Sequence, residues 1–375
     1  MFLFYQNTYI VNSTFQTIEE TKTAESEKET PLKKLFDWER LPNVVFLFPL
    51  IVWAIFRTLK SGTLWTLSAA NPGLTFGGFF GFPKTEAYDL LPPEAYPTTV
   101  LVKPGADFDI VFSKIKAAGI EFPFVVKPDG GMVGLLVRVV EDEATLRKYH
   151  ALVQADWMAQ KMVHYTTEVG AFYVRHPDQE KGQLVGLNQK VPLSVIGDGR
   201  STIGELVKNN EETIPFENEI FEKQEKNWNY VPAKGEFFQL IFTGNRKNGA
   251  RLVTQEDKID DELIALFDKW SHYKNGIYYG RYDIKCESLE SLRKGKDFAV
   301  LEFNGVHSGY GHLYHCDKKP GEVYKEIKRL WNVLYDISMA NHKKGVPYIS
   351  FVEGWKFVFR SLKTFRKLAK WEREL

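Results

Sequence analysis

Two apolar stretches that carry charged residues at alternate positions constrain the fold more than any other feature of this sequence. They are GIYYGRYDIKCE, residues 276–287, and DFAVLEFNGV, residues 297–306, and each is typical of a β-strand. The segment between them, SLESLRKGK at 288–296, is polar and is expected to be a loop. The pattern therefore predicts a hairpin of two strands.

Four polar side chains of this hairpin are expected to share one face of a sheet. Side chains at positions i and i+2 of a strand point to the same side, so Arg281 points with Asp283, and Glu302 points with Asn304. Such groups are costly to bury unless they are paired or bind a metal. Carboxylate and amide oxygens suit Mg²⁺, which also keeps water and phosphate oxygens as ligands. A salt-bridged, solvated face is the alternative interpretation.

A second stretch, VVKPDGGMVG at 125–134, is typical of a phosphate-binding turn. Lys127 ends a β-branched run and is therefore projected from a stiff strand. Gly130 and Gly131 allow tight turns with bare N–H groups, and Gly134 keeps the returning limb thin. No Gly-Lys-Ser/Thr follows, so this is not a Walker motif, and an ordinary glycine-rich turn remains the alternative.

Strands and helices are mixed along the chain without strict βαβ alternation, which predicts an α+β fold. The expected strands are 122–128, 134–140, 156–163 and 168–176, and the expected helices are 141–153, 260–273 and 322–342. Residues 205–235 are charged and irregular, and we expect a surface excursion there.

Whole-chain properties exclude several classes of protein. The 375 residues suffice for two or three domains, and a formal net charge of +1 gives no general attraction to nucleic acid. Two cysteines do not make a disulfide scaffold, which favours a reducing compartment. The N-terminus lacks the basic region and cleavage site of a signal peptide, so we expect a cytoplasmic protein.

Taken in order, these residues resemble the ATP-grasp superfamily, in the branch of D-alanine–D-alanine ligase and other carboxylate–amine ligases. The resemblance covers about two-thirds of the chain, from Asn71 to His315, and the segment SVIGDGRSTIGEL at 194–206 is similar to one in several of these ligases. The motifs that carry it are Lys84, Lys127 with its glycine loop, Gln160-Lys161-Met162-Val163, Glu168, Arg281-Tyr282-Asp283 and Glu302-Phe303-Asn304. Gln160 stands where a glutamate is frequent in these ligases.

The resemblance implies two α+β lobes that clasp ATP, with extra helical segments at both ends of the chain. The implied parts are a disordered tail at 1–30, a helical and glycine-rich segment at 31–104, a small lid lobe at 105–163, a large lobe with the metal site at 164–320, and C-terminal helices at 321–375.

The resemblance also implies roles for single residues. Lys84 and Lys127 would bind the phosphates of the nucleotide, and Gly130, Gly131 and Gly134 would form a mobile flap over them. Lys161, Met162 and Val163 would contact the adenine, and Glu168 would bind the ribose. Mg²⁺ or Mn²⁺ would be held by Asp283, Glu302 and Asn304. Arg281 and Lys127 would be the catalytic cations, with Arg281 stabilising the phosphoryl group during transfer.

The reaction implied is ADP-forming ligation of a small carboxylate to an amine through an acylphosphate. Two other functions stay open at this point: a non-catalytic ATP-binding regulatory module, and a protein associated with a membrane surface. No residue pattern names the substrates or the oligomeric state.

Both ends of the chain carry apolar segments that bear on the membrane hypothesis. VVFLFPLIVWAIF at 44–56 contains Pro49 and is shorter than the ~20 residues of a membrane span, which favours a buried or interfacial helix. Residues 351–375 show an apolar stripe with basic flanks, made of Phe351, Trp355, Val358, Leu362 and Phe365. This helix either docks on the protein core or lies on anionic lipid, and a peripheral contact would use both segments.

Overall fold

The computed structural model describes residues 43–241, 249–314 and 318–375. The predicted disordered tail at 1–30, the start of the segment at 31–104, and His315 lie outside the described residues. Contacts divide the chain into two compact units, one formed by Met1–Phe46 and Lys190–Val253 and the other by Leu47–Gln189 and Thr254–Leu375. Each unit is described by itself.

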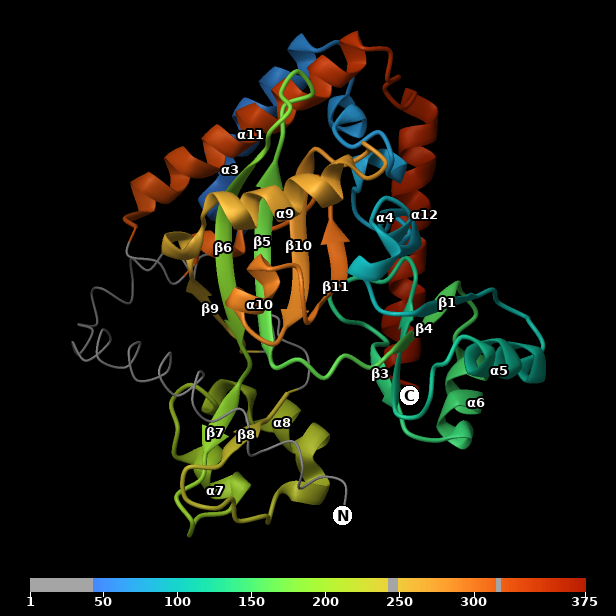
Figure 1. Ribbon diagram of the computed structural model, residues 1–375, viewed down its shortest axis with the longest axis vertical. Helices are drawn as coiled ribbons and strands as arrows, with labels where there is room; N and C mark the ends of the chain where they lie inside the picture. The colour runs from blue at the N-terminus through green and yellow to red at the C-terminus, as the bar shows by residue number, and fades with distance from the viewer. Residues whose placement is uncertain (1–42, 242–248, 315–317) are drawn as a thin grey trace. The chain divides into compact units, whose positions relative to one another are not determined.

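Strands β11, β10, β5 and β6, which lie almost wholly in the larger unit, are the first four of a five-stranded sheet in the order β11-β10-β5-β6-β9 (Figure 1). Its strands are β5 (Thr167–Val174), β6 (Gln183–Val191), β9 (Arg251–Thr254), β10 (Tyr279–Cys286) and β11 (Phe298–Asn304). Helix α9 (Asp261–His272) lies over one face, where Phe267 and Trp270 pack against Tyr282 of β10. This apolar packing leaves the opposite face of β10 available for Arg281 and Asp283.

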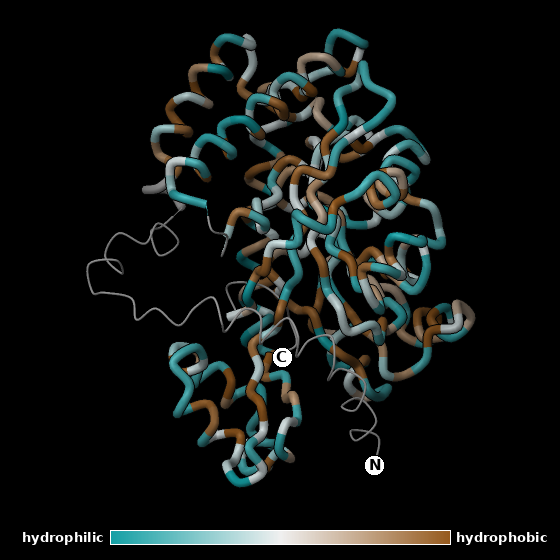
Figure 2. Tube along the Cα trace, turned by 60° about the vertical axis from the view of Figure 1, so that its left-hand side comes forward, coloured by the Kyte–Doolittle hydropathy of each residue, from teal (hydrophilic) through white to brown (hydrophobic). Residues whose placement is uncertain are grey.

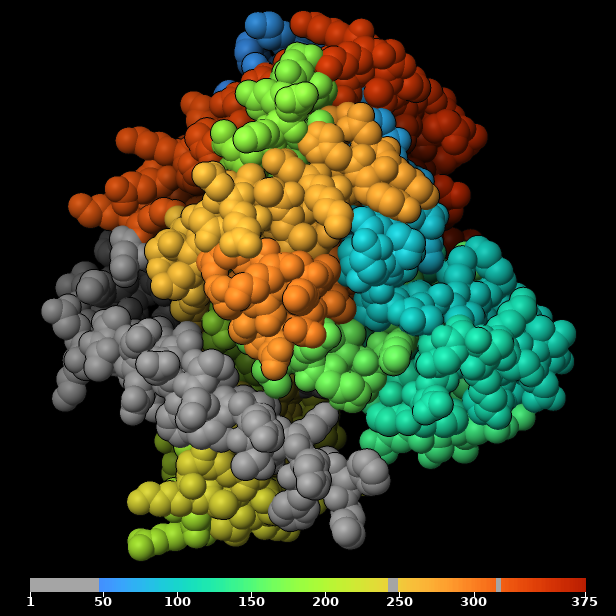
Figure 3. Space-filling model, viewed as in Figure 1, coloured from blue at the N-terminus to red at the C-terminus, as the bar shows by residue number. Residues whose placement is uncertain are grey.

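A second sheet of the larger unit has four strands in the order β1-β4-β2-β3. The strands are β1 (Thr99–Val102), β2 (Phe124–Pro128), β3 (Arg138–Val140) and β4 (Trp157–Lys161), and the accompanying helices are α5 (Phe108–Ala117) and α6 (Glu143–Leu152). Val111 and Ile115 of α5 and Leu146 and Tyr149 of α6 bury their side chains in a separate core with Trp157. In Figure 3 the side chains of α5 and α6, coloured teal to green, form the surface of this layer.

The predicted α+β class is therefore confirmed. Both sheets are antiparallel in every strand pair for which a register is described, and helices cover one face of each. Figure 2 shows hydrophobic residues, coloured brown, interspersed with hydrophilic ones in both the helical and the extended segments. The predicted helices at 141–153, 260–273 and 322–342 correspond to α6, α9 and α11 (Pro320–Lys343).

The expectation of a surface excursion at 205–235 is wrong. The smaller unit contains α7 (Ile203–Lys208) and α8 (Glu217–Gln224), and β7 (Ser194–Ile196) pairs antiparallel with β8 (Phe237–Gln239). Ile203 and Val207 of α7 and Ile220 of α8 are buried in a core of their own. The few apolar residues recur at helical spacing and suffice for a small core, while the polar majority faces solvent.

Two further local expectations need correction. The polar connection at 288–296 contains a short helix, α10 (Leu289–Arg293), because Ser288 caps it by accepting a hydrogen bond of 3.0 Å from the Ser291 N–H and because Leu292 is buried. The strand expected at 134–140 is confined to β3, since the residues before it remain in the turn.

Helices at the two ends of the described chain complete the larger unit. They are α3 (Asn43–Lys60), the short α4 (Lys84–Asp89), α11 and α12 (Phe351–Glu372), and the 3₁₀ turns are η2 (Thr66–Ala69), η3 (Thr75–Gly77), η4 (Pro93–Ala95) and η9 (Gly311–Leu313). The smaller unit adds η5 (Ile214–Phe216) and η6 (Glu225–Asn227), and η8 (Glu256–Lys258) precedes α9. No helix among the described residues is both long and apolar enough to cross a membrane.

Helix α12 docks through a different face from the predicted stripe. Its buried residues are Gly354, Phe357, Ser361 and Leu368. Of the stripe, Phe351, Trp355 and Leu362 are exposed, and Val358 and Phe365 are half-buried. Gly354 is needed because a Cβ there would lie 2.2 Å from the Trp65 ring, so the docked face combines a close backbone approach with the burial of Phe357 and Leu368 in hydrophobic cores.

Candidate active site

The predicted hairpin is present. In the pairing of β10 with β11, Arg281 lies opposite Asn304 and Asp283 lies opposite Glu302. The Arg281 guanidinium donates to both carboxylate oxygens of Asp283, from Nε at 2.8 Å and from Nη2 at 3.0 Å. Asn304 Nδ2 donates to Asp283 Oδ2 at 3.0 Å. Asp283 is buried, so these contacts hold its carboxylate in one orientation.

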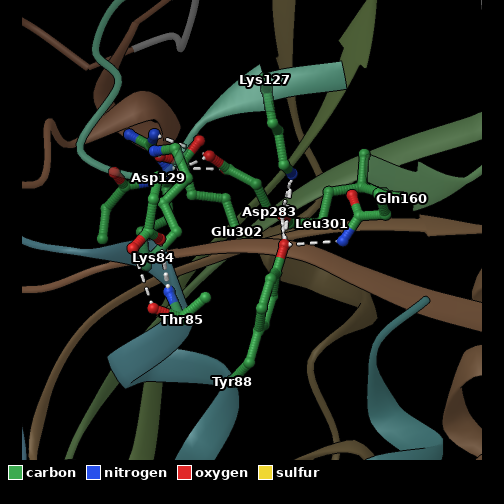
Figure 4. A network of polar contacts seen from close by, with 11 residues as sticks. Lys84, Thr85, Tyr88, Lys127, Asp129, Gln160, Asp283, Leu301 and Glu302 are labelled. Carbon is green, nitrogen blue, oxygen red and sulfur yellow. Dashed lines mark hydrogen bonds and ion pairs between the residues drawn. The ribbon is translucent and has the colours of Figure 1, made fainter. Parts of the chain in front are cut away.

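Glu302 pairs with a residue from a distant part of the chain. Lys84, the first residue of α4, forms an ion pair with the Glu302 carboxylate (Figure 4). The backbone N–H of Lys84 donates to the carbonyl oxygen of Asp129 at 3.1 Å, just after β2. Thr85 donates to the two Asp129 carboxylate oxygens at 2.9 Å, from its backbone N–H and from Oγ1. These contacts tie α4 to the start of the glycine loop.

Lys127 is buried against a tyrosine that the sequence did not single out. Its Nζ donates to the Tyr88 hydroxyl at 3.2 Å and to the Leu301 carbonyl oxygen at 3.0 Å. The Tyr88 hydroxyl donates to the same carbonyl at 2.5 Å and accepts a bond of 3.1 Å from Gln160 Nε2. Figure 4 shows Lys127 and Gln160 converging on this hydroxyl. Tyr88 follows Lys84 by four residues, so helical spacing could have found it.

Burial makes Lys127 sensitive to pH. Loss of hydration lowers the pKa of Lys127 to about 8, although Glu302 and Asp129 oppose this shift. A polyphosphate placed at Lys127 would favour its charged form and raise this pKa again. Binding of such a ligand near pH 8 would therefore take up a proton.

We expect the affinity for Mg·ATP to be constant below pH 8 and to fall by up to about tenfold per pH unit above it, until the pKa of the complex is reached. Calorimetry in buffers of different ionisation enthalpy measures the proton uptake. Lys127→Arg should remove the pH dependence, because a guanidinium stays charged throughout this range. A wild-type affinity that does not change between about pH 7 and pH 9.5 would contradict this assignment.

The glycine loop contains two non-glycine residues in the left-handed region. Val133 has φ of 47° and Leu136 has φ of 59°, while Gly134 has φ of 77°. A β-branched residue such as Val133 adopts this conformation only at an energetic cost. The end of the loop is fixed by Glu372 of α12, which accepts a bond of 2.6 Å from the Leu136 N–H and one of 2.9 Å from Arg138 Nη2.

Glu372→Ala should speed hydrogen exchange in residues 129–136, since the Leu136 N–H loses its acceptor and the loop loses its fixed end. Mg·ATP should slow the same amides in the wild type if the loop covers the phosphates. The matched control is Glu374→Ala, two residues along, where the carboxylate contacts only Lys370 among the described residues. Equal exchange in both variants would show that α12 does not restrain the loop.

The predicted adenine residues lie at the end of β4 and just after it, and the predicted ribose residue Glu168 lies on β5, near enough to Arg281 to favour its charged form. Lys161 ends β4 with an exposed side chain, and its N–H donates to the Thr98 carbonyl oxygen at 2.9 Å. Met162 and Val163 follow it and are half-buried. Glu168, half-buried on β5, is aligned with Lys285 of β10. The roles of these four positions in binding adenine and ribose stay predictions.

Lys285 is a further residue of this surface that sequence reasoning missed. It follows Asp283 by two positions on β10, so the same period of two that grouped Arg281 with Asp283 could have identified it. Burial lowers the pKa of Lys285, and Glu168 opposes the shift. The surface around Asp283 therefore contains one more cation than the motifs indicated.

The donor set fits a partly protein-bound Mg²⁺ better than a closed metal site. Asp283, Glu302 and Asn304 offer two carboxylates and an amide from paired strands. Within the described part of the chain, no group of three or more His, Cys, Asp or Glu side chains is placed to hold a metal. A cation bound here would need ligands from elsewhere, and Mg²⁺ commonly takes these from water and phosphate.

Comparisons with known proteins give relatives in sequence and matches among solved structures. No protein-family model matches the chain. The chain is 27% identical over 249 residues to a cyanophycin synthetase from Trichormus variabilis, covering 61% of this chain and 26% of that protein. It is 25% identical over 173 residues to a glutathione biosynthesis bifunctional protein from Clostridium perfringens, covering 41% and 21% respectively. The chain thus spans about a quarter of the length of the curated relatives it matches.

Solved structures give weaker matches. A D-alanine–D-alanine ligase from Bacillus anthracis aligns with a TM-score of 0.40 and 13% identity, covering 70% of this chain and 69% of that one. A bifunctional glutathione synthetase from Pasteurella multocida aligns with a TM-score of 0.37 and 17% identity, covering 66% and 36%. These structural matches are too weak to support an argument. The sequence relatives confirm the resemblance to ATP-grasp ligases drawn from the motifs.

Proposed function

We propose that this chain, an ATP-grasp protein by its motifs and sequence relatives, is an ATP- and Mg²⁺-dependent ligase that joins a carboxylate to an amine through an acylphosphate. One observation carries the proposal: on one hairpin Arg281 and Asn304 bind the Asp283 carboxylate, and directly opposite Asp283 the Glu302 carboxylate forms an ion pair with Lys84 of α4. Lys127 lies beside them, bonded to the carbonyl oxygen of Leu301, which precedes Glu302. The proposed lobe boundaries are those of 105–163 and 164–320.

Each group of residues in the site would have its own role in the reaction. Bound ATP with Mg²⁺ would supply the phosphoryl group and neutralise part of its charge. Lys84 and Lys127 would bind phosphate oxygens, for which Lys84 leaves its ion pair with Glu302. Asp283, Glu302 and Asn304 would orient the metal, and Arg281 would face the phosphoryl oxygens. Fixed cations of this kind contribute most where charge develops in the transition state.

The proposed substrates are amino acids or short peptides. The names of the relatives support this class, since one is a glutathione biosynthesis protein and one aligned structure is a D-alanine–D-alanine ligase. His307 lies in the loop after β11 and stacks edge-on against Phe79 and Phe80. We place the acceptor end of the site near this loop.

The test is a screen for ADP and phosphate release that depends on both a carboxylate and an amine, run across amino acids, short peptides and small carboxylates. Transfer of oxygen label from the carboxylate to the released phosphate is expected from an acylphosphate. AMP as product, or unlabelled phosphate, would overturn this mechanism. Tight Mg·ATP binding without turnover of any pair would instead support the non-catalytic regulatory module.

Contact with a membrane surface is a second and independent proposal, and it concerns where the protein works. The observation that favours it is a set of exposed apolar side chains on α3 and α12, the helices formed by the segments at 44–56 and 351–375. The cytoplasmic location stays a prediction.

A further inference from the structure

Helix α3 presents an apolar face to solvent. Its inner side packs on α11, where Thr58 Oγ1 lies 2.8 Å from the Tyr335 hydroxyl and Arg57 pairs with Asp336 at 3.0 Å. The outward apolar side chains recur at helical spacing and are Phe48, Val52, Ile55, Phe56 and Leu59. All are exposed, Phe56 to 65% and Leu59 to 74%. Contiguous exposed apolar residues of this extent mark interaction sites rather than ordinary surface.

Helix α12 presents a similar face. Phe357 and Ser361 are buried on its docked side. Its exposed apolar residues include Phe359 at 64% and form the set Phe351, Val352, Trp355, Phe359 and Leu362. Of the apolar stripe predicted from the sequence, Phe351, Trp355 and Leu362 are therefore exposed to solvent, while Val358 packs against the core.

Contacts of Trp65 bring the start of α12 close to the segment that follows α3. The indole Nε1 of Trp65 donates to the Phe351 carbonyl oxygen at 3.3 Å, and the rings of Trp65 and Trp355 lie 5.4 Å apart. Leu64, between α3 and Trp65, is exposed as well. We call the exposed apolar residues of α3 and α12, together with Leu64, the terminal-helix surface.

Cations border the terminal-helix surface on α12. Lys363, Arg366 and Lys367 are exposed, and none of them pairs with a carboxylate among the residues that the structure describes. Lys363 follows Phe359 by four residues and Lys367 follows Lys363 by four, so a basic stripe runs beside the apolar one along the helix. An apolar stripe with lysine and arginine beside it matches the interface of an anionic lipid bilayer.

We infer that the terminal-helix surface docks this protein peripherally on anionic phospholipid, with the apolar residues of α3 and α12 at the acyl boundary and the α12 cations at the headgroups. The inference does not depend on the proposed ligase reaction. It requires no membrane span, in agreement with the absence of a spanning helix from the described residues.

The test is flotation of the full-length protein with vesicles of phosphatidylcholine alone or mixed with phosphatidylglycerol. Binding is expected only to the mixed vesicles and should weaken as salt rises. Ile55→Glu and Phe359→Glu, on separate helices, should each reduce binding more than about tenfold, since a charge would enter the acyl boundary. Lys363→Gln should reduce it about fivefold.

Matched controls come from α5, whose exposed residues are not part of the terminal-helix surface. Ile110 is 58% exposed, close to the 56% of Ile55, so Ile110→Glu makes the same change on another surface and should bind like the wild type. Lys114→Gln controls for Lys363→Gln. The melting temperature of each variant shows whether it has kept its fold. If Ile55→Glu or Phe359→Glu has lost its fold, the variant on the other helix provides the test.

Two results would overturn the inference. One is wild-type protein that does not float with mixed vesicles. The other is a dimer in sedimentation velocity that Ile55→Glu and Phe359→Glu dissociate while vesicle binding is missing or unchanged, because the surface would then belong to a second copy of the chain.

Discussion

Glu302→Gln is expected to lose most of the Mg²⁺ dependence of ATP binding, with affinity for Mg·ATP about ten- to a hundredfold weaker than in the wild type. Glutamine keeps the size of the side chain but removes one of two carboxylates aligned across β10 and β11. It also removes the ion-pair partner of Lys84, which then becomes available to phosphate in the absence of metal. Loss of the carboxylate weakens the binding of Mg·ATP, while release of Lys84 strengthens the binding of ATP without metal. The ratio of the affinities with and without Mg²⁺ is therefore the most sensitive measure.

Calorimetric titrations with ATP in excess Mg²⁺ and in EDTA measure this ratio. We expect a ratio near that of the wild type for Glu121→Gln, an exposed position before β2, and a ratio close to one for Glu302→Gln. Asp283→Asn should behave like Glu302→Gln while disturbing Arg281 as well, because Asp283 accepts both guanidinium bonds. An undiminished Mg²⁺ effect in both variants would remove the metal assignment.

Arg281→Ala is expected to lower turnover by about 10²–10³-fold while changing ATP affinity only a few-fold. The guanidinium is held by two bonds to Asp283 and donates from Nη1 to the Gly309 carbonyl oxygen at 2.9 Å. A cation fixed in this way cannot move to improve its contact with the bound substrate in the ground state. Its interaction therefore stabilises the transition state most, when charge moves onto the transferring phosphoryl group.

Turnover is measured with any carboxylate–amine pair that the wild type accepts, and ATP affinity is measured separately by calorimetry. Arg281→Lys should recover little, because an ammonium cannot make the two-pronged contact with Asp283. Arg147→Ala, an exposed change on α6, should leave both quantities unaltered. A loss of turnover that merely follows a loss of ATP affinity would assign Arg281 to nucleotide binding instead.

Part of the fold followed directly from local pattern. Strand and helix periodicity located β10, β11, α6, α9 and α11, because hydrophobic residues at steps of two or of three and four report which side of an element is buried. The same reasoning failed where a few apolar residues in a polar segment are enough for a core, as in α7 and α8. It also left open whether the apolar stripe of α12 is docked, and the structure docks a face with Gly354 and Ser361 beside Phe357 and Leu368.

The sequence by itself determined that Arg281 and Asp283 share a face, and that Glu302 and Asn304 do so, since a pleated strand alternates sides every residue. Only the tertiary structure decided which distant groups they meet. Lys84 reaches Glu302 across 218 positions, Lys127 reaches the Leu301 carbonyl across 174, and Glu372 reaches the Leu136 N–H across 236. The physical reason is that these contacts form when separately folded layers pack together, and no local periodicity encodes the position of one layer on another.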